Sequence, residues 1–386
     1  MLPFFKNSNE KEKCTGCNSC GNICPTSAII QKIDSDGFFY PDIDLNKCIK
    51  CNKCIEICPE NFNKNKQCKV KKVYAGYTLD SNTLFTSTSG GLFSVLAINI
   101  LKNNGIVFGA AFDNSLNLNH ININNSKELS LLKGSKYIQS SINLCFTEAK
   151  KALDNNKKIL FSGTPCQISG LKSFLNKSYD NLFTIDLICH GVPSFLLFKQ
   201  YINYIENKIK QKISFIEFRN KKTGWNNSSI KIFSGNKFKR WKKSNDSFSI
   251  AFGSRLCLRP CCYKCNYSNF DREGDITLGD FWKIEQFSNN FSTDKGTSLV
   301  LLNSQKGIDL FDTVKNSLFY EESKLEYALK VQPRLKSPSQ YNILRPTFLN
   351  DLKSLNYKQI IKKYKLYKPS LIQRILYKIS KKLRKI

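Results

Sequence analysis

Two stretches near the start of the chain share one cysteine pattern. Residues 14–25 read CTGCNSCGNICP, and residues 48–59 read CIKCNKCIEICP. Both follow the spacing C-x2-C-x2-C-x3-C-P. Three thiolates at intervals of three residues can surround one face of an iron–sulfur cube, while the fourth is displaced by an extra residue. The repeated spacing therefore predicts two clusters.

In proteins with two such clusters, the fourth cysteine of each stretch binds the other cluster. We predict two 4Fe–4S clusters, one held by Cys14, Cys17, Cys20 and Cys58, and the other by Cys48, Cys51, Cys54 and Cys24. The alternatives are zinc and disulfides. Structural zinc usually takes its cysteines in separated pairs, and disulfides require an oxidising compartment. The two triplets, each closed by Cys-Pro, favour iron–sulfur clusters.

Length and composition set wider bounds. At 386 residues, the chain can form two or three domains with a sizeable core. Its N-terminus lacks the apolar stretch of a signal peptide, and no run of eighteen apolar residues predicts a membrane span. We therefore expect a cytoplasmic, reducing location.

The formal net charge is +30. Such a balance is typical of proteins that bind nucleic acid, a membrane surface or an acidic partner. The lysines are spread among asparagines and isoleucines, and no nucleic-acid motif accompanies them. We interpret the charge mainly as compositional bias on solvated faces, and nucleic acid is not an expected partner.

The cysteine stretches belong to a predicted small α+β domain of the two-cluster ferredoxin type, residues 1–68. Residues 29–44 are expected to form a hairpin that turns at Asp36-Gly37. Cys68 lies outside both spacings and is interpreted as a spare thiol.

From residue 69 onward, strand and helix patterns alternate, which predicts an α/β domain with a mixed sheet and flanking helices. We divide it into residues 69–155 and 156–345, followed by a basic tail at 346–386. Strands are expected at residues 73–78, 106–112, 158–162, 183–188 and 297–302, hairpin strands within 213–240, and a helix at 92–101.

Two segments are candidate anion sites. Ser89, Gly90 and Gly91 precede the helix at 92–101, and glycines before a helix let its N-terminus approach an anion. Residues 133–137 read KGSKY, in which Lys133, Ser135 and Lys136 fit a phosphate contact. The alternatives are an ordinary helix cap and a solvated loop.

Later cysteines indicate a third site. Cys166 and Cys189 each follow a predicted strand, at the edge where open α/β sheets gather ligands. Cys262 and Cys265 are spaced C-x2-C and offer two further thiolates. Cys257 and Cys261 compete with them, and zinc is an alternative to a cluster at this point.

The end of the chain is basic and amphipathic. In residues 370–386, apolar side chains fall on one helical face and lysines and arginines lie off it. This pattern fits peripheral contact with an anionic membrane or docking to a partner. A terminal helix that packs on its own protein is the alternative.

Several ordered blocks resemble one family. They read TSGGLFS at 88–94, KGSKY at 133–137, FSGTPCQ at 161–167, DLICHGVP at 186–193, LRPCCYKC at 258–265 and DITLGDFW at 275–282. From Cys14 to about Gly307, the chain is similar to the coenzyme F-420 hydrogenase/dehydrogenase beta-subunit family, in the version with an N-terminal two-cluster ferredoxin.

The resemblance implies FAD in the α/β domain and a third 4Fe–4S cluster near it. It makes Ser89–Gly91, Lys133, Ser135 and Lys136 flavin-phosphate candidates, and it places Asp280 and Trp282 near the flavin or cluster. It implies that Cys166, Cys189, Cys262 and Cys265 bind the third cluster. Two departures are Lys283, where glycine is common, and Cys261, where serine is usual; the second puts the ligand of the Cys261–Cys262 pair in doubt.

The resulting hypothesis is an iron–sulfur flavoprotein oxidoreductase. It would pass electrons between a deazaflavin-like cofactor or small substrate and ferredoxin or another redox partner protein. The alternative is a non-catalytic electron-relay subunit of a larger complex, such as one in a polysaccharide biosynthesis pathway. A basic nucleic-acid-binding iron–sulfur protein is a third hypothesis, which rests on charge alone. His190 is interpreted as a residue that tunes a cluster from outside its ligand shell, or as loop structure.

Overall fold

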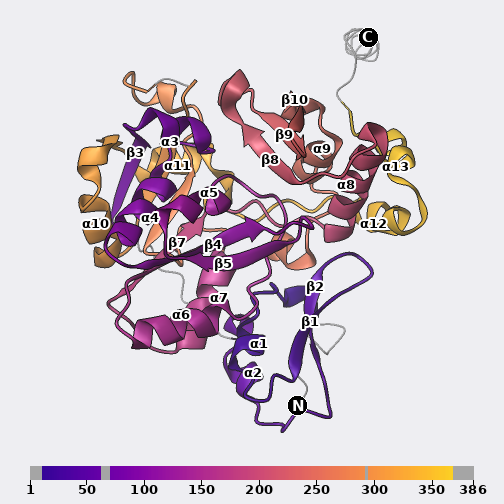
Figure 1. Ribbon diagram of the computed structural model, residues 1–386, viewed down its shortest axis with the longest axis horizontal. Coiled ribbons are helices and arrows are strands. Elements are labelled where there is room, and N and C mark those ends of the chain that lie inside the picture. Colours follow the sequence, from indigo (N-terminus) through magenta and orange to yellow (C-terminus); the bar gives the residue numbers. More distant parts are fainter. Residues whose placement is uncertain (1–10, 62–69, 292–293, 368–386) are drawn as a thin grey trace, which may run out of the picture.

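The computed structural model describes residues 11–61, 70–291 and 294–367. Within these ranges the chain forms a small N-terminal domain, a large mixed sheet with helices on both faces, and a three-stranded sheet backed by helices (Figure 1). The mixed α/β architecture predicted from the sequence is confirmed. None of the helices in these ranges has the length and apolar character needed to cross a membrane.

The N-terminal domain contains the predicted hairpin. Its strands β1 (Ile29–Ile33) and β2 (Phe39–Ile43) pair antiparallel, and short helices α1 (Ser19–Ile23) and α2 (Lys53–Glu56) follow the cysteine loops. The hairpin tip docks on helix α8. Gly37 has a φ of +83°, and a Cβ there would lie 2.4 Å from the backbone nitrogen of Leu196. Glycine is therefore required at this tip for the backbone to approach α8.

The large sheet has the strand order β13-β3-β12-β11-β7-β6-β4-β5 in the described residues. Strands β4, β6, β7 and β11 are parallel to their neighbours within this group, and the outer strands pair antiparallel. The strands are β3 (Lys72–Thr78), β4 (Ile106–Phe112), β5 (Leu118–Ile123), β6 (Ile159–Gly163), β7 (Leu182–Leu187), β11 (Ile276–Asp280), β12 (Ser298–Leu302) and β13 (Leu318–Glu322).

Helices cover both faces of this sheet because its central strands are apolar on both sides. On β4, Val107 packs into the core under helices α4, α5 and α10, whereas Phe108 packs under α6 and α7. These helices are α4 (Leu92–Lys102), α5 (Leu129–Leu132), α6 (Cys145–Asp154), α7 (Pro165–Leu175) and α10 (Gln305–Asp312), and α11 (Leu325–Val331) covers the β3 side.

The three-stranded sheet lies beside the large one (Figure 1). It has the order β10-β9-β8, formed by β8 (Phe215–Asn220), β9 (Ser229–Ser234) and β10 (Lys237–Lys242). Its core is shared with α8 (Phe195–Ile209), α9 (Ser247–Gly253), α12 (Arg345–Ser354) and α13 (Tyr357–Lys363), and also with the N-terminal hairpin.

The chain stays packed well beyond the expected start of the tail. Phe348, Leu352 and Ile360, on α12 and α13, are completely buried in this shared core. Packing therefore continues past residue 346 because these two helices carry their own apolar faces. The amphipathic stretch at 370–386 lies outside the described residues.

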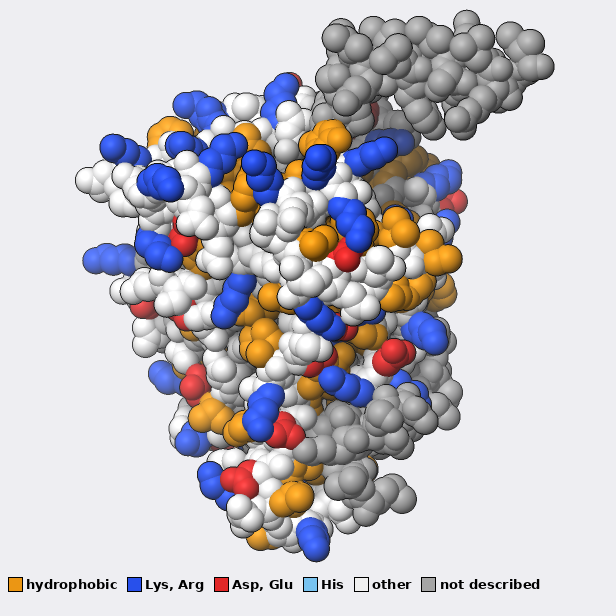
Figure 2. Space-filling view, turned by 90° about the vertical axis from the view of Figure 1, so that its right-hand side faces the viewer, with side chains coloured by type: hydrophobic (Ala, Val, Ile, Leu, Met, Phe, Trp, Pro, Cys, Tyr) orange, Lys and Arg blue, Asp and Glu red, His pale blue; other side chains and the backbone are white. Residues whose placement is uncertain are grey.

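Charge on the surface is dispersed. Figure 2 shows Lys and Arg side chains across the whole of the face that it presents, with fewer Asp and Glu between them. That distribution is the one expected of solvated lysines.

Candidate functional site

The two N-terminal cysteine loops have the same backbone geometry. In the first loop Gly16 and Asn18 have φ values of 71° and 62°, and in the second loop Lys50 and Asn52 have values of 56° and 59°. These residues flank the second cysteine of each stretch. The sequence repeat is therefore also a conformational repeat, which turns three thiols toward one side of each loop.

The structure brings the eight cysteines together in two groups. Burial raises the pKa of Cys20, and the nearby thiols of Cys17, Cys14 and Cys58 raise it further. Burial also raises the pKa of Cys54, and its neighbouring thiols are Cys51, Cys24 and Cys48. Each group thus holds three cysteines from one stretch and the fourth from the other. Four thiols that face one another in this way fit the donor set of a 4Fe–4S cluster.

The two groups differ in exposure. Cys14, Cys17 and Cys20 are buried, whereas Cys51 is exposed and Cys48 and Cys54 are half-buried. One side of the domain therefore faces the rest of the protein, and the other faces solvent.

A cavity next to the buried group collects the later cysteines. Its wall includes five thiols together with His190, Arg272, Arg334, Gln139 and Thr15, the five being Cys166, Cys189, Cys261, Cys262 and Cys265. Burial raises the pKa of Cys166 and Cys189, the latter to about 11, and the thiol of Cys265 adds to both shifts. In the described parts of the chain, no three His, Cys, Asp or Glu side chains form a group that could hold a single metal ion.

Strand ends and a short helix bring these thiols together. Cys166 follows β6 in the first turn of α7, where Gln167 Oε1 accepts a hydrogen bond from Thr164 N–H at 3.0 Å and fixes the helix start. Cys189 follows β7. Cys262 lies in the 3₁₀ helix Pro260–Lys264, and Cys265 ends it.

Cys257 lies apart from this cavity. It is completely buried among apolar side chains of the shared core, and its carbonyl accepts a hydrogen bond from Ser194 N–H. The competition that the sequence leaves open is thus reduced to Cys261 and Cys262, which both line the cavity.

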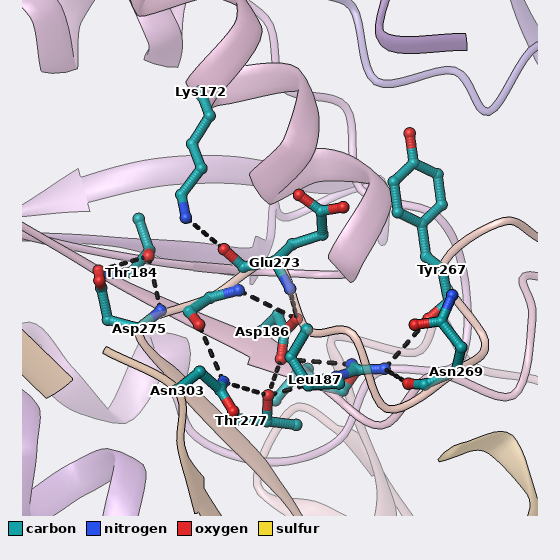
Figure 3. Close-up of polar contacts among 12 residues, drawn as sticks. Lys172, Thr184, Asp186, Leu187, Tyr267, Asn269, Glu273, Asp275, Thr277 and Asn303 are labelled. Atoms are coloured by element: carbon teal, nitrogen blue, oxygen red, sulfur yellow. Dashed lines mark hydrogen bonds and ion pairs between the residues drawn. The ribbon is translucent and has the colours of Figure 1, made fainter. Parts of the chain in front are cut away.

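A buried polar network anchors the cavity wall (Figure 3). Arg272 Nη2 lies 3.3 Å from Asp186 Oδ1, and both side chains are almost completely buried. Arg272 also donates to the carbonyls of Tyr267, Asn269 and Leu187 at 3.0–3.1 Å. Arg272 therefore joins the loop after Cys265 to the strand end before Cys189.

Asp186 is fully satisfied on the other side of this network. Its carboxylate accepts hydrogen bonds from the backbone N–H groups of Glu273 and Gly274 and from Thr277 Oγ1. Because a buried carboxylate is costly without such partners, the network holds the end of β7 in one geometry.

The candidate anion segments lie side by side. Ser135 N–H donates to Thr88 Oγ1 at 2.8 Å, and Lys133 Nζ lies 3.3 Å from Thr86 Oγ1. Gly91 is the N-cap of α4, with a φ of 84°. The two segments thus form one surface at the start of α4.

Not every residue of these segments points its polar atoms outward. Lys136 Nζ donates to the carbonyls of Leu132, Lys133 and Gly134, and burial lowers the pKa of Lys136 to about 7. Ser89 Oγ donates to Thr297 O at 2.9 Å, and Gly90 N–H donates to Ser298 Oγ at 3.0 Å. Lys136 and Ser89 therefore shape the loops that carry them.

Asp280 and Trp282 lie at the end of β11, against residues of the other sheet. Arg219 Nη1 lies 2.5 Å from Asp280 Oδ2, and its guanidinium is 5.1 Å from the Trp282 ring centroid. Trp225 stacks on Trp282, with ring centroids 4.5 Å apart. Sequence reasoning missed Arg219 and Trp225 because they come from β8 and the loop after it, and they form no motif.

A buried lysine links this group to the anion segments. Lys221 Nζ donates to the carbonyls of Leu84, Ser89 and Lys295 at 2.5–2.9 Å, and burial lowers the pKa of Lys221 to about 8. It was also missed, since no local pattern distinguishes it from the chain's many solvated lysines.

Four buried polar atoms in this region have no hydrogen-bond partner in the described residues: Arg219 Nη2, Trp225 Nε1, Asp280 Oδ1 and Thr297 Oγ1. Buried polar atoms in folded proteins are nearly always paired, either within the protein or with a bound molecule. Two donors, an acceptor and a hydroxyl beside stacked aromatic rings fit a flat, polar-edged cofactor.

Comparisons with known proteins agree with this arrangement. Residues 13–62 match the family model of the 4Fe-4S dicluster domain. Residues 156–327 match the family model that describes the C terminus of the beta subunit of coenzyme F420 hydrogenase/dehydrogenase. No curated protein matches the chain.

Among solved structures, a chain of the F420-reducing [NiFe] hydrogenase complex from Methanosarcina barkeri is similar at 15% identity. The alignment covers 78% of this chain and 94% of that one, with a TM-score of 0.45. The two family models locate the family membership more directly. The protein joins a 4Fe-4S dicluster domain at its N-terminus to the C-terminal region of the coenzyme F420 hydrogenase/dehydrogenase beta-subunit family.

Proposed function

We propose that the protein is an iron–sulfur flavoprotein oxidoreductase. It exchanges electrons between a hydride-type donor or acceptor and ferredoxin or another redox partner, through FAD and 4Fe–4S clusters. The observation that carries this proposal is the position of the cysteine-lined cavity. Thr15 of the first cysteine loop is in its wall, and so are His190 and Arg334, which lie toward Asp280.

His190 connects the cavity to the region of Trp282. It lines the cavity beside Cys189, and the charges of Asp280 and Lys243 reach its ring. Gln332 donates a hydrogen bond to the carbonyl of Asp280, and Arg334 follows it in the cavity wall. The candidate flavin region, the cavity and the dicluster domain therefore follow one another through direct contacts.

Cys166, Cys189, Cys262 and Cys265 would hold a third 4Fe–4S cluster in this cavity. In a 3₁₀ helix, residues three apart lie on the same face, so Cys262 and Cys265 point in one direction. Cys261 is rotated away by a third of a turn and also faces Cys14. Its charge reaches Cys166, Cys189 and Cys265 as well, which makes it the one competing ligand.

FAD would be held by the surface formed by Ser89–Gly91, Lys133–Lys136, Asp280 and Trp282. When bound, it supplies acceptance of a hydride and release of single electrons. The N-terminus of α4 and the Lys133 ammonium favour a phosphate group. Trp282 and Trp225 offer an apolar wall, and the unpaired Nη2 of Arg219 offers a charged hydrogen bond.

Metal and flavin analysis of anaerobically purified protein tests the proposal. Three clusters correspond to about twelve irons per chain and two clusters to about eight. We expect about twelve irons with matching sulfide, and FAD released on denaturation.

A different result selects the alternative. About eight irons and no FAD after reconstitution would indicate a relay subunit that only passes electrons from ferredoxin to a partner enzyme. The same preparation, mixed with a deazaflavin or a nicotinamide cofactor, shows whether the flavin absorbance bleaches, which identifies the class of hydride donor.

A further inference from the structure

Arg259 is a completely buried arginine between the dicluster domain and the cavity. Its Nε donates to the carbonyl of Cys14 at 2.7 Å, and its Nη1 donates to the carbonyl of Phe39 at 2.8 Å and to Gln139 Oε1 at 3.1 Å. The guanidinium also lies 4.1 Å from the ring centroid of Tyr40. One side chain thus contacts both the first cysteine loop and the hairpin.

This buried cation has no acidic partner among the described residues. Its hydrogen bonds are to carbonyls and an amide, and its Nη2 has no partner there. Burial opposes the charge, but the thiols of Cys14 and Cys261 favour it, and the net effect raises the pKa of Arg259. Since an unpaired charge in a protein interior is costly, the anionic counterpart must come from these cysteine groups.

Other contacts bring the Cys14 group to the same place. Gly170 of α7 lies against Cys17, and Ser19 Oγ donates to the Gly170 carbonyl at 2.9 Å. Glu60, which follows Cys58-Pro59, accepts a hydrogen bond of 2.6 Å from Tyr267, two residues after Cys265. Both ends of the Cys14 group are therefore attached to the segments that carry the cavity cysteines.

We propose that Arg259 is the counter-ion shared by the Cys14 cluster and the third cluster, and that it raises the reduction potential of the Cys14 cluster relative to the Cys48 cluster. The Cys14 cluster is then the one that exchanges electrons with the cavity, while the Cys48 cluster faces the redox partner. This inference rests on the proposed function for the part that concerns the third cluster.

The physical reason is charge in a medium of low polarisability. A 4Fe–4S cluster with four thiolates is anionic, and reduction adds one more negative charge. A guanidinium that water does not screen stabilises the reduced form more than the oxidised one. The Cys48 group has no such buried cation beside it in the described residues. Cys51 and Lys53 are exposed, so solvent screens the lysine charge.

The test is a redox titration of the full chain, reconstituted anaerobically with iron and sulfide and followed by EPR. A Cys51→Ala variant assigns the signals of the two clusters. We expect Arg259→Met to lower the midpoint potential of the Cys14 cluster and to leave that of the Cys48 cluster in place. Arg259→Lys keeps the charge and is expected to restore most of the shift. The matched control is Lys53→Met, which removes an exposed charge beside Cys54.

Two outcomes would overturn the inference: an unchanged Cys14 midpoint in Arg259→Met, or an equal shift in Arg259→Lys, which would indicate a purely structural pin. If Arg259→Met does not assemble the cluster, Arg259→Gln replaces it, because glutamine can still donate to the Cys14 carbonyl. Absence of FAD or of the third cluster would overturn the proposed function and leave this comparison intact, since both measured clusters belong to the dicluster domain.

Discussion

At the scale of single residues, the chemistry depends on which thiols face one another. The cavity offers five cysteines for the four positions of a cluster, and the sequence could not choose among them. Cys262 and Cys265 share one face of a 3₁₀ helix, whereas Cys261 points partly toward Arg259 and Cys14. Local helix geometry therefore separates two adjacent and chemically identical residues.

The first prediction concerns this pair. We expect Cys262→Ser to lose about four irons per chain, because the third cluster loses a ligand on the shared face. We expect Cys261→Ser to keep them. Iron and sulfide assays on both variants decide the matter, with Cys257→Ala as a thiol control outside the cavity. Loss of iron in Cys261→Ser alone would exchange the roles of the two residues.

The second prediction concerns pH. His120 is buried, with Nδ1 at 2.8 Å from Ser140 Oγ and Nε2 donating to Ser162 O at 2.9 Å, and burial lowers its pKa from 6.5 to about 4. Above pH 6.5 the ring is neutral in both the folded and the unfolded chain. As pH falls from 6.5 to 4 only the unfolded chain takes up the proton, so the folded state loses up to about 3 kcal/mol.

Thermal unfolding at about pH 7.5 and about pH 5, on either side of the ordinary histidine pKa, measures this effect. The melting temperature of the wild type is expected to fall more between these values than that of His120→Gln, which cannot take up the proton. Equal losses in the two proteins would assign the acid sensitivity to other groups, such as the clusters.

At the scale of elements, close approach of two helices positions the dicluster domain. Gly170 of α7 has no side chain, and a Cβ there would lie 2.7 Å from Ser19 Oγ, 2.8 Å from Cys17 Cβ and 3.0 Å from Cys17 Sγ. Since α7 also begins with Cys166, one helix touches both the Cys14 group and the cavity. Its glycine sets the spacing between them.

The third prediction follows from that contact. Gly170→Ala should displace α1 and weaken the Cys14 group, because Cys17 cannot move away while it binds a cluster. Iron content and hydrogen exchange of residues 14–23 measure the change. Gly253→Ala is the control, since a Cβ at that helical glycine meets nothing within 4 Å. Unchanged exchange in Gly170→Ala would mean that α1 adjusts freely.

At the scale of the whole molecule, the described structure is polarised. The cavity lies between the large sheet and the buried side of the dicluster domain, and the Cys51 side faces solvent. Lys47, Lys50 and Lys53 surround this exposed side, and all three are exposed. An acidic redox partner fits such a collar.

The fourth prediction concerns that collar. The rate of electron exchange with an acidic ferredoxin should fall steeply as salt rises, and it should fall at low salt in a Lys47→Glu/Lys53→Glu variant. Stopped-flow measurements give both rates. A small uncharged dye serves as the control acceptor and should show neither dependence. A rate with ferredoxin that ignores both salt and charge reversal would place the partner elsewhere.

The sequence by itself determined the elements that depend on local pattern. The cysteine repeat, the hairpin at 29–43 and the strands at 72–78, 106–112 and 159–163 could all be read from spacing and periodicity, because short-range geometry fixes them. The dicluster domain and the family of residues 156–327 could be recognised in the same way, since their motifs are contiguous.

Only the tertiary structure decided which distant residues meet. Arg219, Lys221 and Trp225 approach Asp280 and Ser89 from a separate sheet, and Arg259 reaches Cys14 across more than two hundred residues. The cysteine repeat alone describes a ferredoxin that could stand by itself. Its burial against α7 and Arg259 follows from long-range packing and from the cost of an unpaired buried charge, neither of which leaves a local pattern in the sequence.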